Sequence, residues 1–372
     1  MEMVKRELKT LKAASLELGI SYSQAKRIYR RYLTGGDKAL AHGNKGKPSN
    51  NKTDEETVKK AVELYRERYC DFGPTLAQEM LCERDGLEIS VSTLRRALVS
   101  AGLWKQKKNS SEYRSRRTPR ARFGELVQFD GSHHKWFEER GPSCCLITMI
   151  DDATKTRLSL FFDEETMFGA MTVLKMWIER YGIPKSLYCD KKNAFVLTRE
   201  PTDAEILAGI LKPKSHFGRA CDRLGIEVIA ANSPQAKGRV ERNHGVDQDR
   251  LVKALRLEGI CTIENANRFL LETYLPKMNE KFSRPAQSGD DAHVHLGKVN
   301  LDNILCMEFD RHISKDFIIR FQARLFQILK TNKPLPRTAD KILVRIKLDN
   351  SIHFIWKDKP LLVKEIPTMF DE

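Results

Sequence analysis

The sequence lacks any apolar run that approaches the roughly 18 uncharged residues of a bilayer-spanning helix. Its first residues, Met-Glu-Met-Val-Lys-Arg, do not contain the apolar core of a signal peptide. Hydrophobic residues nevertheless make up 41% of the 372 residues, enough for a sizeable core. These features exclude a membrane-spanning or disordered protein. From the length we expect about two to four domains, and we expect the protein in the cytoplasm.

The sequence also lacks a C-x-x-C pair, although it contains eight cysteines. Without a secretory context, we expect these thiols to be reduced and to act as small buried hydrophobic residues. The first 128 residues offer only His42, Cys70 and Cys82 as soft metal ligands. A zinc-dependent amino-terminal module is therefore not expected.

Acidic residues are scarce relative to basic ones, and the formal net charge is +15. Residues 1–128 hold 27 Lys and Arg against 16 Asp and Glu, a net charge of +11. Such a basic amino-terminal region predicts a polyanionic partner, most simply double-stranded DNA. A membrane surface is a weaker alternative, because the basic segments lack an amphipathic helix with a bulky aromatic face.

Residues 1–46 predict a helix-turn-helix module. The pattern from Thr10 to Tyr32 indicates a helix, a tight turn at Gly19 and a second helix that begins after Ser21. Polar and cationic side chains on the second helix suit the major groove of DNA. The candidate DNA contacts are Ser21, Gln24, Lys26 and Arg27. A three-helix packing module without DNA is the alternative.

A second helix-turn-helix module is predicted for residues 53–104, after a linker rich in Gly, Lys and Asn. Its third helix, from Ser90 to Ala101, carries the candidate DNA contacts Thr93, Arg95 and Arg96. Two tethered modules would gain affinity through effective concentration, and their phosphate contacts would make binding strongly salt-dependent. Residues 105–122 follow with eight Lys and Arg, either as a solvated linker or as a basic strap along DNA.

From Phe123 onwards, the periodicity predicts an α/β core over residues 123–285. Five strands and a long helix are expected, with an insertion near residues 195–215. The strands are predicted at residues 126–130, 144–150, 157–162, 186–189 and 227–231, and the helix at residues 165–181. Residues 299–372 predict a small β module, interpreted as a barrel, with a hairpin that turns at Asp349 and Asn350.

Three acids in the core form a candidate catalytic set. Asp130 ends the first predicted strand, Asp190 follows the fourth, and Glu241 belongs to a charged helical segment at residues 235–251. Two Mg²⁺ ions about 4 Å apart, held by such carboxylates, would activate the nucleophile and the leaving group in phosphodiester cleavage. Taken singly, each aspartate could belong to a turn, and Glu241 to a salt-bridged surface helix.

With their flanking residues, these acids resemble a known family. Four stretches carry the resemblance: Val127-Gln-Phe-Asp-Gly-Ser-His-His-Lys-Trp136, Met149-Ile-Asp-Asp-Ala-Thr154, Asp190-Lys-Lys-Asn-Ala-Phe195 and Gly238-Arg-Val-Glu-Arg-Asn-His-Gly245. Together with the helix-turn-helix front end, they are similar to the integrase-core DDE transposases of bacterial insertion sequences, most of all to the ISNCY-type group.

The resemblance implies that Asp130, Asp190 and Glu241 are the catalytic and metal-binding triad on a ribonuclease-H-like sheet, whose first and fourth strands are neighbours. It also implies two Mg²⁺ ions, for which Mn²⁺ can substitute. Asp151 and Asp152 compete for a place in the triad but are interpreted as turn residues. The cations of the charged segment are predicted to hold phosphates near the metals; they are Lys237, Arg239, Arg242 and His244.

The function implied is a transposase that binds the ends of its mobile element, cleaves by Mg²⁺-dependent hydrolysis and joins the 3′-hydroxyl to target DNA. Its partners would be double-stranded DNA and further copies of itself in a synaptic multimer, with no membrane, in a nucleoid-associated bacterial setting. The alternatives are a catalytically inert DNA-binding regulator and a plain metal-dependent nuclease. Gly245, inside the charged segment, predicts a close approach of DNA or protein backbone.

Overall fold

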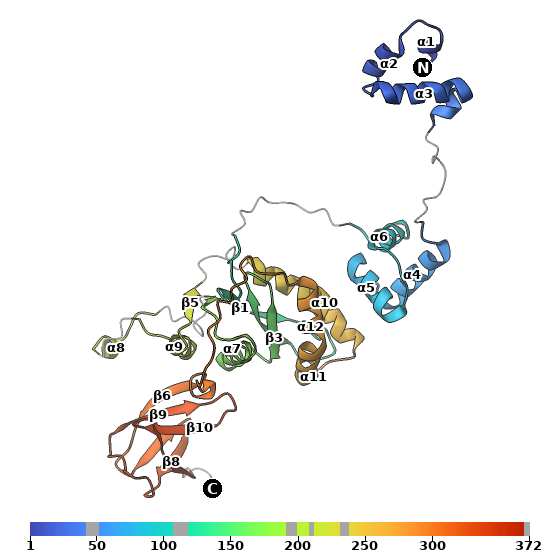
Figure 1. The fold of residues 1–372 in the computed structure, drawn as a ribbon. Helices are drawn as coiled ribbons and strands as arrows, with labels where there is room; N and C mark the ends of the chain where they lie inside the picture. Colours follow the sequence, from blue (N-terminus) through green and yellow to red (C-terminus); the bar gives the residue numbers. More distant parts are fainter. Residues whose placement is uncertain (42–51, 107–117, 191–198, 208–211, 231–237, 368–372) are drawn as a thin grey trace. The chain divides into compact units, whose positions relative to one another are not determined.

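The computed structural model describes residues 1–41, 52–106, 118–190, 199–207, 212–230 and 238–367, and it divides into two compact units, Met1–Ser110 and Ser111–Glu372 (Figure 1). Each unit is described by itself below. Over these described ranges, none of the helices is both long enough and apolar enough to cross a membrane.

The first unit begins with the predicted helix, turn and helix. The Thr10 and Ser21 side chains accept hydrogen bonds from the backbone of Ala13 and Gln24, which fixes where the two longer helices start. Between them Gly19 adopts a φ of +63°, the left-handed conformation that glycine allows at little cost. The elements are α1 (Glu2–Lys5), α2 (Leu11–Glu17), α3 (Tyr22–Gly35) and the 3-10 helix η1 (Gly36–Leu40).

The second part of this unit contains the three further helices that the sequence predicts. Asp54 and Ser90 cap the first and the third of them, and Pro74 begins the second, where its missing N–H is not needed. Buried Leu94 and Leu98 form the inward face of the third helix. The helices are α4 (Glu55–Arg68), α5 (Pro74–Asp85) and α6 (Val91–Ser100).

The core of the second unit is a five-stranded mixed sheet, which confirms the predicted α/β core. The strand order is β3-β2-β1-β4-β5. Neighbouring strands are antiparallel in the β3-β2-β1 half and parallel in the β1-β4-β5 half, so the first and fourth strands are adjacent, as predicted. The bounds are β1 (Val127–His134), β2 (Cys144–Asp151), β3 (Arg157–Phe162), β4 (Ser186–Cys189) and β5 (Glu227–Ala230).

Helices cover both faces of this sheet (Figure 1). On one face, α7 (Met167–Tyr181) lies so close that a Cβ at Gly169 would be 2.8 Å from the Ile147 side chain. On the same face, α9 (His216–Arg223) places Phe217 against Phe129, with 5.8 Å between the ring centroids. The opposite face is covered by α10 (Gly238–Leu257), α11 (Ile263–Phe269), the π-helical turn η3 (Leu270–Tyr274) and α12 (Leu275–Phe282).

The predicted insertion near residues 195–215 contains a short helix, α8 (Asp203–Leu207). Residues 191–198 and 208–211 of this region lie outside the described residues. After the core, a 3-10 turn, η4 (Leu301–Asn303), leads into the carboxy-terminal module.

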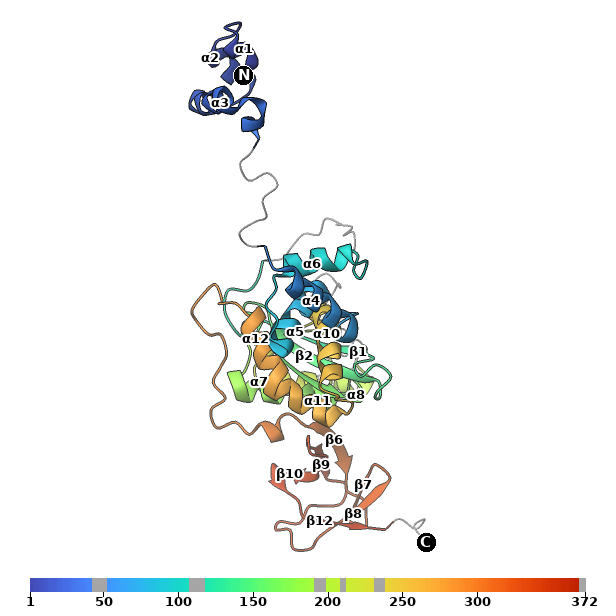
Figure 2. The same ribbon diagram turned by 90° about the vertical axis from the view of Figure 1, so that its right-hand side faces the viewer.

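The carboxy-terminal module has two sheets around one hydrophobic core, and Figure 2 shows them as two groups of strands. Because its described strands do not join into one sheet, the predicted barrel is not confirmed. The predicted hairpin is present: Ile352 pairs with Ile346, and Asn350 in the turn has a φ of +62°. The strands are β6 (Met307–His312), β7 (Ile318–Phe321), β8 (Arg324–Ile328), β9 (Lys341–Ile346), β10 (Ile352–Trp356), β11 (Lys359–Pro360) and β12 (Val363–Ile366).

A buried carboxylate joins this module to the core. Glu308 on β6 accepts hydrogen bonds from both terminal nitrogens of Arg223 on α9, at 2.8 and 2.7 Å, and from Nε of Arg345 on β9 at 2.8 Å. Burial by itself would raise the pKa of Glu308, but the two guanidinium groups outweigh it and lower the pKa below the usual value. The paired charges therefore tie β6 to the core.

Candidate active site

Helix α10 runs beside β1, and every fourth residue of the helix meets every second residue of the strand. The contacts are the Val240 N–H to Oε1 of Gln128 (3.2 Å), Nε2 of His244 to Oδ2 of Asp130 (3.4 Å), and Nε2 of Gln248 to Oγ of Ser132 (3.2 Å). The two spacings match, since four helical residues rise about 6 Å and two strand residues about 6.6 Å. The match keeps α10 alongside the strand that carries Asp130.

Asp190 comes directly after β4, the strand that pairs in parallel with the Asp130 strand β1. The parallel pair aligns Val127 with Leu187 and Gln128 with Tyr188, an offset of 60 residues. Extending the same offset by two residues brings Asp130 level with Asp190, on strands about 4.8 Å apart. Residues that share a row of a sheet point to the same face, so the register favours two carboxylates on the α10 side.

Glu241 lies in the first turn of α10, next to the buried Val240, and is itself exposed, as are Arg242 and Gly245. The oxygen atoms of Asp130, Asp190 and Glu241 are not all within 4.8 Å of one another; among the described residues, only His133, Cys145 and Glu165 form such a group. Three negatively charged carboxylates repel one another, which favours side chains that stay apart.

The donor set of these three acids fits Mg²⁺. All the ligand atoms would be carboxylate oxygens from β1, the end of β4 and α10, and Mg²⁺ prefers oxygen ligands while keeping several of its waters. A bound metal would supply charge relief at the attacking and leaving oxygens of a phosphodiester.

The carboxylates of Asp151 and Asp152, which the sequence analysis interprets as turn residues, accept hydrogen bonds from other groups of this chain. Asp151 is fully buried and accepts hydrogen bonds from the backbone of Gly124, Ala153 and Thr154. Burial raises the pKa of its carboxyl, and these hydrogen bonds oppose the rise. Asp152 accepts from the Arg120 N–H and from Nε2 of Gln128. Asp151 therefore closes the turn after β2, and Asp152 links this turn to β1 and to the segment before it.

A buried ion pair anchors α10 at its middle. The Arg157 guanidinium on β3 lies 2.9 and 3.1 Å from the two oxygens of Asp247, and the Tyr274 hydroxyl donates to the same carboxylate at 2.8 Å. Asn243 also donates to it, at 2.8 Å. Burial raises the pKa of Asp247, while the Arg157 charge lowers it. The network joins three elements and fixes the position of α10 along the sheet.

His244 was predicted to hold phosphate, and its burial does not fit that role. The residue is only 7% exposed, and neither ring nitrogen has a hydrogen-bond partner among the described residues. Its Nε2 faces the Asp130 carboxylate instead. The helical spacing that made His244 look like one more surface cation also places it on the inward stripe of α10.

The other predicted DNA contacts occupy mixed positions. Gln24, Lys26 and Arg27 are exposed on α3, whereas the Ser21 hydroxyl is engaged as its N-cap. On α6, Arg95 and Arg96 are exposed and Thr93 is half-buried. Arg242 is exposed on α10; Lys237 and the Arg239 side chain lie outside the described residues.

Sequence reasoning missed the residues that hold the site in place, namely Gln128, Arg157, Asp247 and Tyr274. The inward stripe of α10 is Val240, His244, Asp247, Leu251 and Leu255, and all five residues are buried. A single acid on a mostly apolar stripe predicts a buried partner, and this signal could have identified Asp247.

The cysteines are all free, as expected, but three of them are not buried. Cys70 and Cys82 are exposed, and Cys261 is half-buried, so the expectation of buried hydrophobic residues is wrong at these positions.

Known proteins identify the family. The chain is 39% identical over 355 residues to "Putative transposase y4bF" of Sinorhizobium fredii (strain NBRC 101917 / NGR234), covering 95% of this chain and 76% of that protein. It belongs to the transposases of bacterial insertion sequences. The transposase for insertion sequence IS1202 of Streptococcus pneumoniae is 29% identical, over 96% of this chain and 83% of that protein. No protein-family model matches this transposase, and its assignment to the ISNCY-type group remains a prediction.

Solved structures with some likeness to this transposase come from retroviruses. A chain of the simian T-cell lymphotropic virus intasome in complex with PP2A regulatory subunit B56 gamma is 14% identical, covers 80% of this chain and 99% of that chain, and gives a TM-score of 0.34. The HTLV-2 integrase catalytic core domain in complex with magnesium is 19% identical, covers 41% of this chain and 85% of that chain, and gives 0.31. At these TM-scores the likeness carries no weight for the site.

Proposed function

We propose that this transposase cleaves and joins DNA at a two-metal site held by Asp130, Asp190 and Glu241. The observation that carries the proposal is the meeting of three elements: the β1–β4 register sets Asp190 level with Asp130, and the α10–β1 contacts bring the first turn of α10 to the same edge. Two Mg²⁺ ions, or Mn²⁺ in their place, would supply the charge relief that in-line displacement needs.

In this proposal the chain's own residues bind and orient the DNA. The exposed Arg242 and Gly245 lie beside Glu241 on the outward side of α10, where a phosphodiester backbone could approach. A helix without a side chain at one position permits closer contact with a backbone. His244 acts as a positioning residue, because its buried ring faces Asp130 and limits how that carboxylate can turn.

The front unit would recognise the ends of the element. Its two helical modules present Gln24, Lys26 and Arg27 on one helix and Arg95 and Arg96 on another, all exposed. The proposed partners are element ends and target DNA, held by a multimer because two ends must be brought together. A nucleoid-associated location follows from this DNA binding. The domain limits stay a prediction from the sequence.

The test is strand cleavage and strand joining on DNA that carries the element's ends, in the presence of Mg²⁺. Asp130→Asn, Asp190→Asn and Glu241→Gln should each abolish both reactions while DNA binding persists. Asp249→Asn is the matched control, since Asp249 is an exposed acid farther along α10. A triad variant that cleaves at the wild-type rate would remove that residue from the site.

Two further outcomes separate the alternatives. Cleavage without joining of a 3′-hydroxyl end would indicate a plain nuclease, and DNA binding without any metal-dependent cleavage would indicate a regulator. For the front unit, replacing both Arg95 and Arg96 with Ala should weaken binding to the element's ends at near-physiological salt. Unchanged affinity would remove α6 from the DNA-reading surface.

A further inference from the structure

We infer a second metal site, suited to zinc or a similar thiophilic divalent cation, formed by His133, Cys145 and Glu165 on the face of β1 opposite Asp130. One nitrogen, sulfur or oxygen atom from each of these residues lies within 4.8 Å of the other two. This inference goes beyond the proposed strand-transfer function and does not depend on it.

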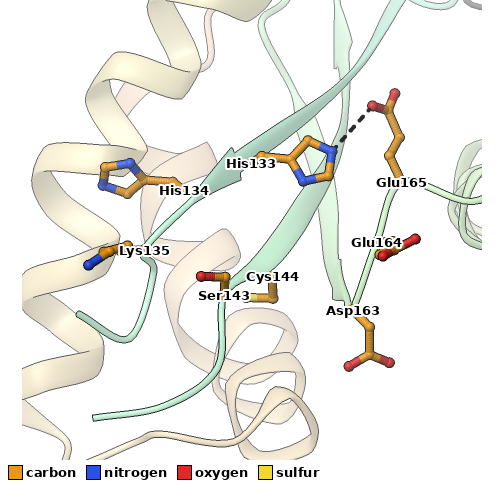
Figure 3. A pocket seen from close by; sticks show the side chains of 8 residues that line it. All are labelled: His133, His134, Lys135, Ser143, Cys144, Asp163, Glu164 and Glu165. Carbon is orange, nitrogen blue, oxygen red and sulfur yellow. Dashed lines mark ion pairs between the residues drawn. The ribbon is translucent and has the colours of Figure 1, made fainter. Parts of the chain in front are cut away.

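The fold itself brings the three residues together. His133 on β1 pairs directly with Cys145 on β2, and both side chains point to the face that α7 covers. Glu165 comes from the segment between β3 and α7, one residue before the N-cap Thr166. Its Oε2 lies 3.7 Å from Nε2 of His133. Figure 3 shows His133 directed toward Glu165, whereas His134 points to the other side of the strand.

Gly131 provides independent support for this site. A Cβ at Gly131 would lie 2.6 Å from Cδ of Glu165, so the carboxylate occupies space that any other residue would fill. The Glu165 side chain, which lies over β1, is only 7% exposed, and Cys145 is fully buried.

The ligand types decide which metal fits. A thiolate, an imidazole and a carboxylate are the usual zinc ligands, whereas Mg²⁺ prefers oxygen alone. Zinc–ligand bonds of about 2.0–2.3 Å place tetrahedral ligands roughly 3.3–3.8 Å apart. The His133 and Glu165 atoms are already 3.7 Å apart, and a pair at the 4.8 Å limit would need to approach by roughly 1.0–1.5 Å. His133 has a side chain that is 59% exposed and can move by that amount.

A pocket beside the group leaves room for a fourth ligand. It has a volume of about 700 Å³ and is lined by His133 and Glu165, together with Asp163 and Glu164 (Figure 3). Water could complete a tetrahedral site from this side, and the added acids favour a cation. The site would cross-link β2 and the segment before α7 to β1, the strand that carries Asp130.

The test is zinc binding by the full chain in excess Mg²⁺, measured by equilibrium dialysis, with Co²⁺ as a spectroscopic probe for a thiolate ligand. Wild-type protein should bind zinc, and His133→Asn or Glu165→Gln should weaken that binding by at least about tenfold. The matched controls, His353→Asn and Cys261→Ser, lie outside this pocket and should bind as wild type does. Cys145→Ser should remove the near-ultraviolet thiolate-to-cobalt charge-transfer absorption.

Gly131→Ala tests the site without replacing any of its three metal-binding residues. The added methyl group meets the far end of a flexible side chain, so the protein should fold while Glu165 is displaced and zinc binding weakens. The inference is overturned if the wild-type chain retains no zinc in excess Mg²⁺, or if His133→Asn and Glu165→Gln bind zinc as tightly as the wild type. Neither readout uses catalysis, so the two proposals fail separately.

Discussion

The two sides of α10 have opposite characters although their residues alternate in the sequence. The inward side carries Val240, His244 and Asp247, all buried against the sheet. The outward side carries Glu241, Arg242 and Gly245, all exposed. Each side carries ionisable residues, so charge alone does not separate residues that hold the helix from residues available to DNA. Contact with β1 and β3 makes that distinction.

The comparison leads to a general expectation for this helix. Changes on the outward side should alter catalysis or DNA binding without destabilising the fold. Changes on the inward side should alter stability first, and activity only through the position of Asp130 or Glu241. Four substitutions test this division.

The largest effect is expected from Glu241→Gln on the outward side. Loss of one carboxylate from a two-metal site removes several kcal/mol of transition-state stabilisation, so cleavage should fall by about 10³-fold or more. The thermal unfolding midpoint should stay within about 1 °C of wild type, because the side chain is exposed. A large loss of stability together with activity would place Glu241 with the inward residues.

Asp247→Asn tests the inward side. Arg157 would keep its charge in a buried setting without a counter-charge, and the free energy of unfolding should fall by about 3–5 kcal/mol. Denaturant unfolding measures this change. Asp249→Asn is the matched control on the same helix; its carboxylate is 54% exposed, and about 0–1 kcal/mol is expected. Equal effects from the two variants would contradict the assigned difference between the sides.

Arg242→Ala should weaken DNA binding by roughly 10- to 150-fold, because a charge-assisted phosphate contact contributes about 1.5–3 kcal/mol. The salt dependence of binding should become shallower by about one unit in the log–log slope. Binding titrations at several salt concentrations measure both quantities. An unchanged slope would remove Arg242 from the phosphate-binding surface.

Gly245→Ala is expected to have the smallest effect on the fold, and in the stabilising direction. No atom lies within 4 Å of a Cβ built at Gly245, so a backbone of this chain does not explain the glycine within the described residues. Alanine should raise helix stability by about 1 kcal/mol. If DNA backbone approaches here, the same variant should bind DNA more weakly; stabilisation with unchanged DNA affinity would remove that explanation.

Much of the fold could be predicted from sequence, because its strands are short apolar runs with turn residues between them. The third and fourth strands agree with the prediction at both ends, and Ser21 and Ser90 cap the helices that they were expected to begin. The carboxy-terminal hairpin was predictable from the alternation of Val344 and Ile346 with charged residues. The division of the carboxy-terminal module into two sheets could not be predicted, since the alternation of apolar and polar residues does not show where a sheet ends.

The site could be predicted only in part. Asp130 and Asp190 stand out because each follows an apolar run, and the strand order then makes them neighbours. The roles of His244 and Asp247 could not be predicted from charge, because burial depends on which side of α10 meets the sheet. His133, Cys145 and Glu165 are distant in sequence, and only the β1–β2 register and the space above Gly131 bring them together.

The most direct test of the central claim is to locate the metal in the folded protein. Fe²⁺ bound in place of Mg²⁺, with ascorbate and peroxide, generates hydroxyl radicals that cut the nearby backbone. Cuts should cluster near Asp130, Asp190 and Glu241, and excess Mg²⁺ should suppress them. Cuts confined to other positions, or cuts at the triad that persist in Asp130→Asn, would contradict a metal site built by these three acids.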